Sequence, residues 1–139
     1  MTIEIVHGYP PNIDQIDAAF GVRRLPNVVF AWDGKIYNPN GAVHLSADVI
    51  EHEKIHFAQQ RKHPTGVEGW WAEYIRYPSF RFNQELEAYQ RQWRFASQFM
   101  NRSERRVFLD RLATSLSGPM YGKIVTKATA KDFIVGRTL

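Results

Sequence analysis

The sequence predicts an α+β fold in which a small N-terminal β-sheet precedes a series of helices. Short apolar runs broken by turn signals fill residues 1–46, helical periodicity fills residues 47–139, and no repeat or low-complexity linker separates the two parts. The chain has 139 residues, of which 44% are hydrophobic, and this is enough for one packed domain. We therefore predict a single domain, mainly β with one short helix up to residue 46 and mainly α beyond it.

The predicted sheet consists of short strands near the N-terminus. Residues 2–9 alternate in polarity and are typical of a strand, and residues 12–21 predict a short helix. Asp33-Gly34 lies between two apolar runs and strongly indicates a two-residue hairpin turn. Residues 42–46 predict a further short strand, after which the β part of the chain ends.

Capping residues and prolines set the boundaries of the remaining helices. Ser46 is a good N-cap for the first of them, Pro64 ends it, and Pro78 stops the next one. Asn83 is expected to cap a long helix, whereas Ser103 and Arg106 do not form a full capping box. The predicted helices span residues 47–62, 66–77, 84–100, 103–117 and 129–136, with residues 79–82 as a loop.

The first long helix contains His52-Glu53-Lys54-Ile55-His56, which has the His-Glu-x-x-His spacing. At 100° per residue, His52, Glu53 and His56 share one sector of the helix, and its charged residues lie opposite. Histidines four residues apart can reach one zinc ion, and Glu53 can take a proton from a zinc-bound water and pass it to a leaving amine. We therefore predict Zn²⁺ as cofactor, with His52 and His56 as ligands and Glu53 as catalytic base. Hydrogen-bonded core histidines and a non-catalytic metal site are the alternatives.

A catalytic zinc keeps three protein ligands, and the chain has no cysteine, so the third must be His, Asp or Glu. His63 lies about 10 Å beyond His56 along the helix axis, and we expect it to be a cation at the helix C-terminus. Glu85 lies about 60° from the centre of the apolar stripe of its helix and Glu87 about 140°. Glu85 therefore borders the core. It is the favoured third ligand. Its alternative role is that of an acid in the first turn, which interacts favourably with the helix dipole.

The pair of motifs His52-Glu53-Lys54-Ile55-His56 and Glu85-Leu86-Glu87-Ala88 resembles the gluzincin branch of zinc metallopeptidases. The resemblance covers at most residues 43–89, and the whole chain is similar to small peptidases of phage and bacterial genomes. It implies a zincin-like fold, hydrolysis of a peptide or amide bond, the ligands His52, His56 and Glu85, and Glu53 as general base. Zincins usually carry an uncharged residue at the position of Lys54, which here faces solvent on the helical wheel.

Two further roles are needed at such a site. Peptide hydrolysis develops an oxyanion that a side-chain donor usually stabilises, and the ligand histidines need hydrogen-bond acceptors. Gln59 and Gln60 are candidate acceptors, or ordinary helix surface. The oxyanion candidates, between which the sequence does not choose, are Tyr89, Tyr121, Tyr77 and His44.

Charge and hydropathy limit the classes of partner that are expected. The expected partner is a peptide or protein substrate, which includes cell-wall peptide. The net charge is +4, but the arginines of residues 91–111 are expected to form a solvated face, so nucleic acid is an unlikely partner. No secretory signal or membrane span is recognised, and we expect a protein of the cytoplasm or one that a phage particle carries. The alternative functions are a non-catalytic zincin-fold module, for example a virion component, and a basic binder of nucleic acid or anionic polymer.

Overall fold

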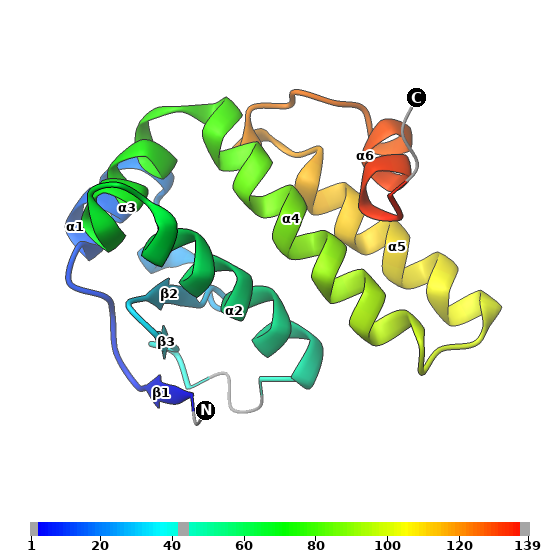
Figure 1. Ribbon diagram of the computed structural model, residues 1–139, viewed down its shortest axis with the longest axis horizontal. Helices are drawn as coiled ribbons and strands as arrows, with labels where there is room; N and C mark the ends of the chain where they lie inside the picture. Colours follow the sequence, from blue (N-terminus) through cyan, green and yellow to red (C-terminus); the bar gives the residue numbers. More distant parts are fainter. Residues whose placement is uncertain (1–2, 42–44, 137–139) are drawn as a thin grey trace. The chain divides into compact units, whose positions relative to one another are not determined.

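The computed structural model describes residues 3–41 and 45–136 and has the predicted α+β composition (Figure 1). The chain divides into two compact units, Met1–Arg76 and Tyr77–Leu139. The single domain over residues 1–139 stays a prediction. The first unit contains β1 (Glu4–Val6), α1 (Ile13–Phe20), the 3-10 helix η1 (Val22–Arg24), β2 (Phe30–Trp32), β3 (Lys35–Tyr37), α2 (Ala47–Lys62) and α3 (Gly66–Arg76). The second contains α4 (Pro78–Ser97), α5 (Arg102–Leu116), the 3-10 helix η2 (Pro119–Tyr121) and α6 (Lys127–Ile134).

The sheet has three strands in the order β1-β3-β2, with β1 parallel and β2 antiparallel to β3. The predicted hairpin is confirmed, since Asp33 and Gly34 connect β2 to β3 with φ of 49° and 82°. Positive φ at both positions is typical of a type I′ turn. The strand predicted over residues 42–46 falls largely on residues 42–44, which lie outside the described residues, and Leu45 and Ser46 are not in a strand.

Helix α2 lies against the hairpin and begins and ends where the sequence predicts. Its Phe57 is buried in an apolar cluster with Ala31 and Ile36 of the strands. Beside this cluster, Gln60 Nε2 donates to the Ala31 carbonyl at 2.8 Å, and the Asp33 N–H donates to Gln60 Oε1 at 3.0 Å. One buried side-chain amide thus satisfies a donor and an acceptor of the hairpin backbone. Both polar atoms of the Gln60 side chain therefore bond to the hairpin backbone.

Replacing Gln60 with Ala is expected to lower the free energy of unfolding by roughly 1–3 kcal/mol, because the hairpin loses two bonds near the core. Urea denaturation followed by circular dichroism measures this difference. The neighbouring Arg61→Ala is the matched control, since Arg61 is exposed on the same helical turn, and it should change the value by at most about 0.5 kcal/mol. Equal effects of the two substitutions would contradict this role of Gln60.

Helix α1 confirms the predicted boundaries with one difference at its start. Gly21 ends the helix in the left-handed conformation with φ of 65°, and Ile16 is buried. Asn12 holds the N-cap position, but its side chain makes no capping hydrogen bond. The Asn12 side chain instead lines a cavity that is described below.

The largest difference from the predicted elements is the start of α4. The sequence predicts a loop at residues 79–82 and an N-cap at Asn83, and both predictions are wrong, because α4 begins at Pro78 and includes Asn83. Proline suits the first position of a helix, where its fixed φ is helical and its missing N–H would have no helical partner. Pro78 therefore separates α3 from α4 by starting the second helix. As a consequence, Glu85 lies well beyond the first turn of α4.

The second unit consists of α4, α5 and α6 packed on each other, with α5 and α6 joined by ion pairs (Figure 1). Asn101 and Glu104 form a full capping box at the start of α5. This box lies two residues before Ser103 and Arg106, where the sequence indicated no full box. Lys127 and Lys131 of α6 contact Asp110 of α5 at 2.9 and 3.1 Å. These hydrogen bonds hold the pKa of Asp110 below its usual range, so the stabilisation that they give is lost as pH falls through that lowered pKa.

No helix within the described residues is long and apolar enough to cross a bilayer.

Candidate metal centre

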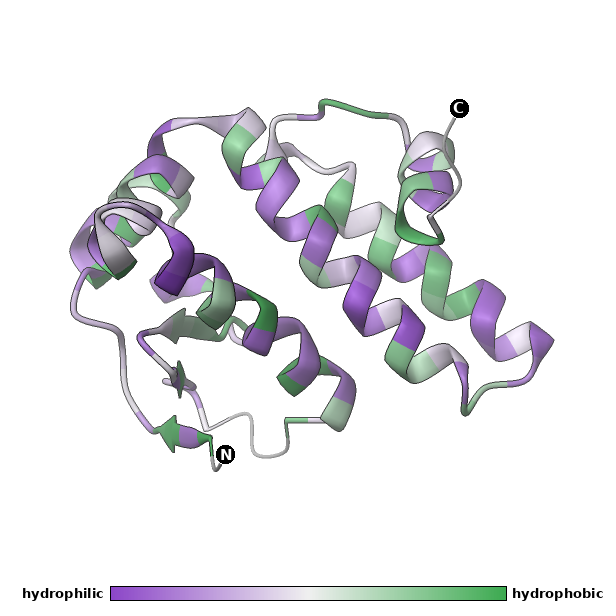
Figure 2. Ribbon diagram, in the orientation of Figure 1, coloured by the Kyte–Doolittle hydropathy of each residue, from purple (hydrophilic) through white to green (hydrophobic). Residues whose placement is uncertain are grey.

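The buried side of α2 is polar. Figure 2 shows a helix that is hydrophilic over much of its length, and of its buried residues only Phe57 is apolar. The others are His52, Glu53, His56, Gln59 and Gln60. Burial of polar groups costs free energy unless each finds a partner. The buried side of α2 therefore places two imidazoles and a carboxylate where each of them needs a partner.

The residues of the motif lie together. Single ligand atoms of His52, Glu53 and His56 all lie within 4.8 Å of one another, and the three side chains are 9, 5 and 4% exposed. The two imidazole rings are 5.0 Å apart between centroids, and Glu53 Oε2 is 3.9 Å from His52 Nε2. The inward orientation predicted for the histidines is thus found in the structure. Lys54 is exposed and pairs with Glu51 at 3.6 Å, as the helical wheel predicts.

Gln59 determines which nitrogen of His56 carries the proton. Gln59 Oε1 lies 2.8 Å from His56 Nδ1, and a carbonyl oxygen can only accept, so Nδ1 carries the hydrogen. In the neutral form of this ring, the lone pair is then on Nε2. The ring also packs against Trp70, with centroids 5.3 Å apart. A hydrogen bond and an aromatic neighbour together orient His56, which is the arrangement that ligand histidines usually have.

Of the two glutamines that the sequence offered as acceptors for the histidines, one has this role. Gln59 contacts His56, whereas Gln60 bonds to the hairpin backbone. Both are buried and adjacent in sequence, so helical spacing alone did not separate them. Gln59 at i+3 and Gln60 at i+4 both lie on the side of His56, so only their contacts in the fold distinguish them.

His63 has partners outside the motif. It is the C-cap residue of α2, which confirms its predicted place at the helix end. Its Nδ1 accepts from the Thr65 N–H at 3.2 Å, and its Nε2 lies 2.7 Å from Glu73 Oε1. His63 Nε2 thus faces a carboxylate, and the role of His63 as a cation at the helix end stays a prediction. Both nitrogens are used in the connection between α2 and α3.

Glu85 lies on α4 in the second unit and is 5% exposed, whereas Glu87 is exposed, as the apolar stripe predicts. The alternative role as a first-turn acid does not hold, because α4 begins at Pro78. Arg81 lies one turn before Glu85 and is also buried. Its Nε donates to the Met120 carbonyl at 2.7 Å. The assignment of Glu85 as a metal ligand stays a prediction.

The oxyanion candidates differ in exposure. Tyr121 is buried in η2, Tyr89 is half-buried on α4 and Tyr77 is exposed before α4. His44 lies outside the described residues. The arginines of residues 91–111 are exposed except for the half-buried Arg91, which agrees with the predicted solvated face.

Comparisons with protein-family models, curated proteins and solved structures give no significant match to this chain. The resemblance to gluzincins therefore depends on the two motifs, and the functional argument depends on the chemistry of the side chains.

Proposed function

We propose that this protein is a zinc-dependent metallopeptidase that hydrolyses a peptide or amide bond. The proposal depends mainly on one observation, the buried group of His52, Glu53 and His56 on α2. Two imidazoles at i and i+4 suit zinc, and Gln59 orients one of them. When bound, the zinc ion supplies Lewis acidity and makes water acidic enough to be deprotonated near neutral pH.

Glu53 is the proposed general base. Its carboxylate is buried beside His52, where it can accept a proton from the attacking water and deliver it to the leaving amine. Burial serves this role, since a carboxylate with few water neighbours holds a fixed position and acts strongly on charge that develops near it. Glu51, which lies on the charged side of the same helix, pairs with Lys54 instead.

Glu85 is the proposed third ligand. Its carboxylate is buried well inside a helix, and such a group needs a cation, a metal ion or several donors. Ala88, three residues later, is fully buried, so this side of α4 faces the interior. Arg81 lies at the i−4 position, where an arginine can serve as a structural partner in place of a metal ion. A test of Glu85 must therefore measure metal binding as well as stability.

The proposed function is tested first by metal content and chelation. Purified full-length protein is expected to hold about one zinc per chain, in line with a three-ligand site. Removing zinc with a chelator should lower the melting temperature, because a metal that binds only the folded state stabilises it by about 2.7 kcal/mol at 100 times its Kd. Hydrolysis of a fluorogenic peptide mixture should stop with chelator and return with added Zn²⁺. Zinc-free protein with an unchanged melting temperature would sink the proposal.

Gln59→Ala is expected to weaken zinc binding by about 10- to 100-fold, because His56 loses the acceptor that fixes its tautomer and orientation. Competition with a chromophoric chelator measures the affinity. Gln59→Glu, which keeps an acceptor oxygen at this position, should retain most of it. If both variants bind zinc as the wild type does, Gln59 has no part in the site.

A further inference from the structure

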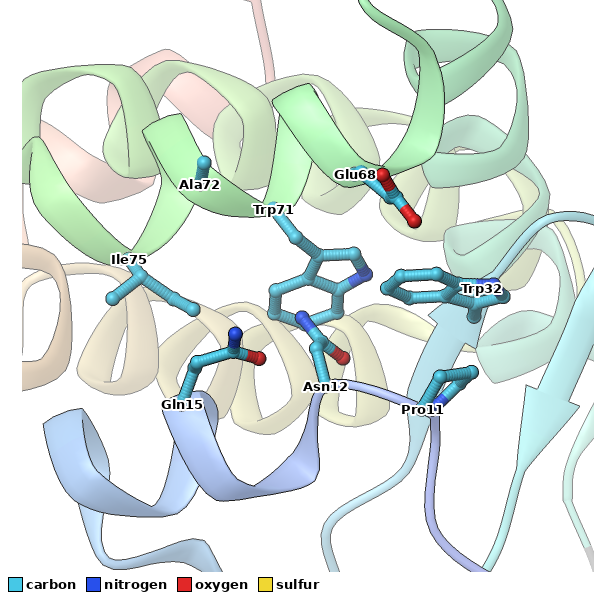
Figure 3. A pocket seen from close by; sticks show the side chains of 8 residues that line it. All are labelled: Pro11, Asn12, Gln15, Trp32, Glu68, Trp71, Ala72 and Ile75. Carbon is cyan, nitrogen blue, oxygen red and sulfur yellow. The ribbon is translucent and has the colours of Figure 1, made fainter.

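The first unit also contains a cavity that shares no residue with the His-Glu-x-x-His motif. It is a cavity of about 480 Å³ between the start of α1, the end of β2 and α3 (Figure 3). This volume is within the range of small-molecule sites. The cavity is lined by Pro11, Asn12, Gln15, Trp32, Glu68, Trp71, Ala72 and Ile75, none of which belongs to the motif.

The lining combines aromatic rings with acceptor groups. Figure 3 shows the Glu68 carboxylate on one side of the Trp32 and Trp71 rings and the amides of Asn12 and Gln15 on the other side. The Trp71 indole N–H donates to the Ala31 carbonyl at 3.0 Å, so this ring is held in place by the sheet. Within the described lining, Glu68 alone carries a charge.

In the part of the chain that the structure describes, Asn12 carries an unsatisfied buried acceptor at the edge of the cavity. Its Oδ1 is buried, and no donor among the described residues reaches it. Buried side-chain acceptors usually have a partner. The hydrogen bond that an N-cap oxygen normally accepts from a backbone N–H of its helix is not formed by Asn12. Because this oxygen has almost no exposed surface, a ligand in the cavity reaches it only if the Asn12 side chain rotates.

We propose that this cavity binds a primary alkylammonium group, of the kind that a lysine side chain or a diamino acid carries. An ammonium has three N–H donors and no acceptor, and the Glu68 carboxylate in the lining offers acceptor oxygens together with a negative charge. Indole faces attract cations more strongly than the other aromatic side chains do. The single negative charge matches a single positive one. The proposal does not depend on the peptidase function.

The test uses the full-length protein and three probes of similar size. These are N-acetyl-lysine amide, N-acetyl-norleucine amide, which lacks the ammonium, and N-acetylglucosamine, which tests a sugar in place of a cation. Binding is followed by the indole N–H signals in ¹H–¹⁵N spectra. We expect the lysine amide alone to shift the Trp71 and Trp32 signals, and to do so less as salt is raised.

Two variants of equal charge change locate the site. Glu68→Gln should weaken binding of the lysine amide about tenfold or more. The ammonium would lose its charged hydrogen bond to the carboxylate and keep only the cation–π contact with the indole rings. Glu87→Gln, exposed in the other unit, should leave the affinity unchanged. Failure of the lysine amide to bind, equal affinity of Glu68→Gln, or equal binding of norleucine amide would overturn the proposal. Binding of N-acetylglucosamine in place of the lysine amide would assign the cavity to a sugar and overturn it as well.

Discussion

Glu53→Gln is expected to lower kcat by about 10²- to 10⁴-fold, the range typical of a lost general base. Glutamine is close in size to glutamate but cannot accept the proton, and the imidazoles of His52 and His56 remain in place. Zinc content should therefore stay near that of the wild type. The measurement pairs metal analysis of the purified variant with its rate on the fluorogenic peptide that the wild type cleaves fastest.

The matched control is Glu51→Gln on the same helix. Glu51 makes an ion pair with Lys54 on the charged side, and such surface pairs contribute at most about 1 kcal/mol. Its rate should stay within about twofold of the wild-type rate. A Glu53→Gln variant that cleaves as fast as the Glu51→Gln variant would reject Glu53 as the base. A variant that loses both zinc and activity would make Glu53 a ligand instead, which its place beside His52 Nε2 also allows.

Glu85→Gln is expected to weaken zinc binding by roughly 100-fold or more, because a neutral amide replaces one of three ligands, and even partners of the ligands contribute 10- to 100-fold. The affinity is measured by competition with a chromophoric chelator, and the melting temperature of the metal-free protein is recorded beside it. The second measurement separates ligation from a structural role with Arg81. If Glu85 acts only as a metal ligand, the melting temperature of metal-free Glu85→Gln stays close to that of the metal-free wild type.

Glu87→Gln is the control, since it makes the same change two residues later at an exposed position of α4. It should bind zinc as the wild type does. If Glu85→Gln lowers the metal-free melting temperature but not the zinc affinity, Glu85 is a structural partner of the kind that buried arginines need. The third ligand would then have to be another His, Asp or Glu, while the roles of His52 and His56 would stand.

Much of the local structure could be predicted because short-range physics sets it. The type I′ turn at Asp33-Gly34 follows from residues that accept positive φ, and α2 keeps its predicted ends because Ser46 and Pro64 bound it. The polar inward side of α2 follows from spacing alone, since residues four apart share a face. The error at α4 has the same local origin, because proline can both end one helix and begin another, and the prediction gave Pro78 only the first of the two roles that it has here.

The sequence by itself determined the α+β order, the helix that carries the His-Glu-x-x-His motif, and the side of that helix on which the histidines lie. Only the tertiary structure decided which glutamine serves His56, because Gln59 and Gln60 differ in what the fold brings to them: an imidazole in one case, the hairpin backbone in the other. The cavity of Trp32, Glu68 and Trp71 was likewise beyond sequence reasoning. Its walls come from three elements far apart in the chain, and no periodicity records contacts between distant segments.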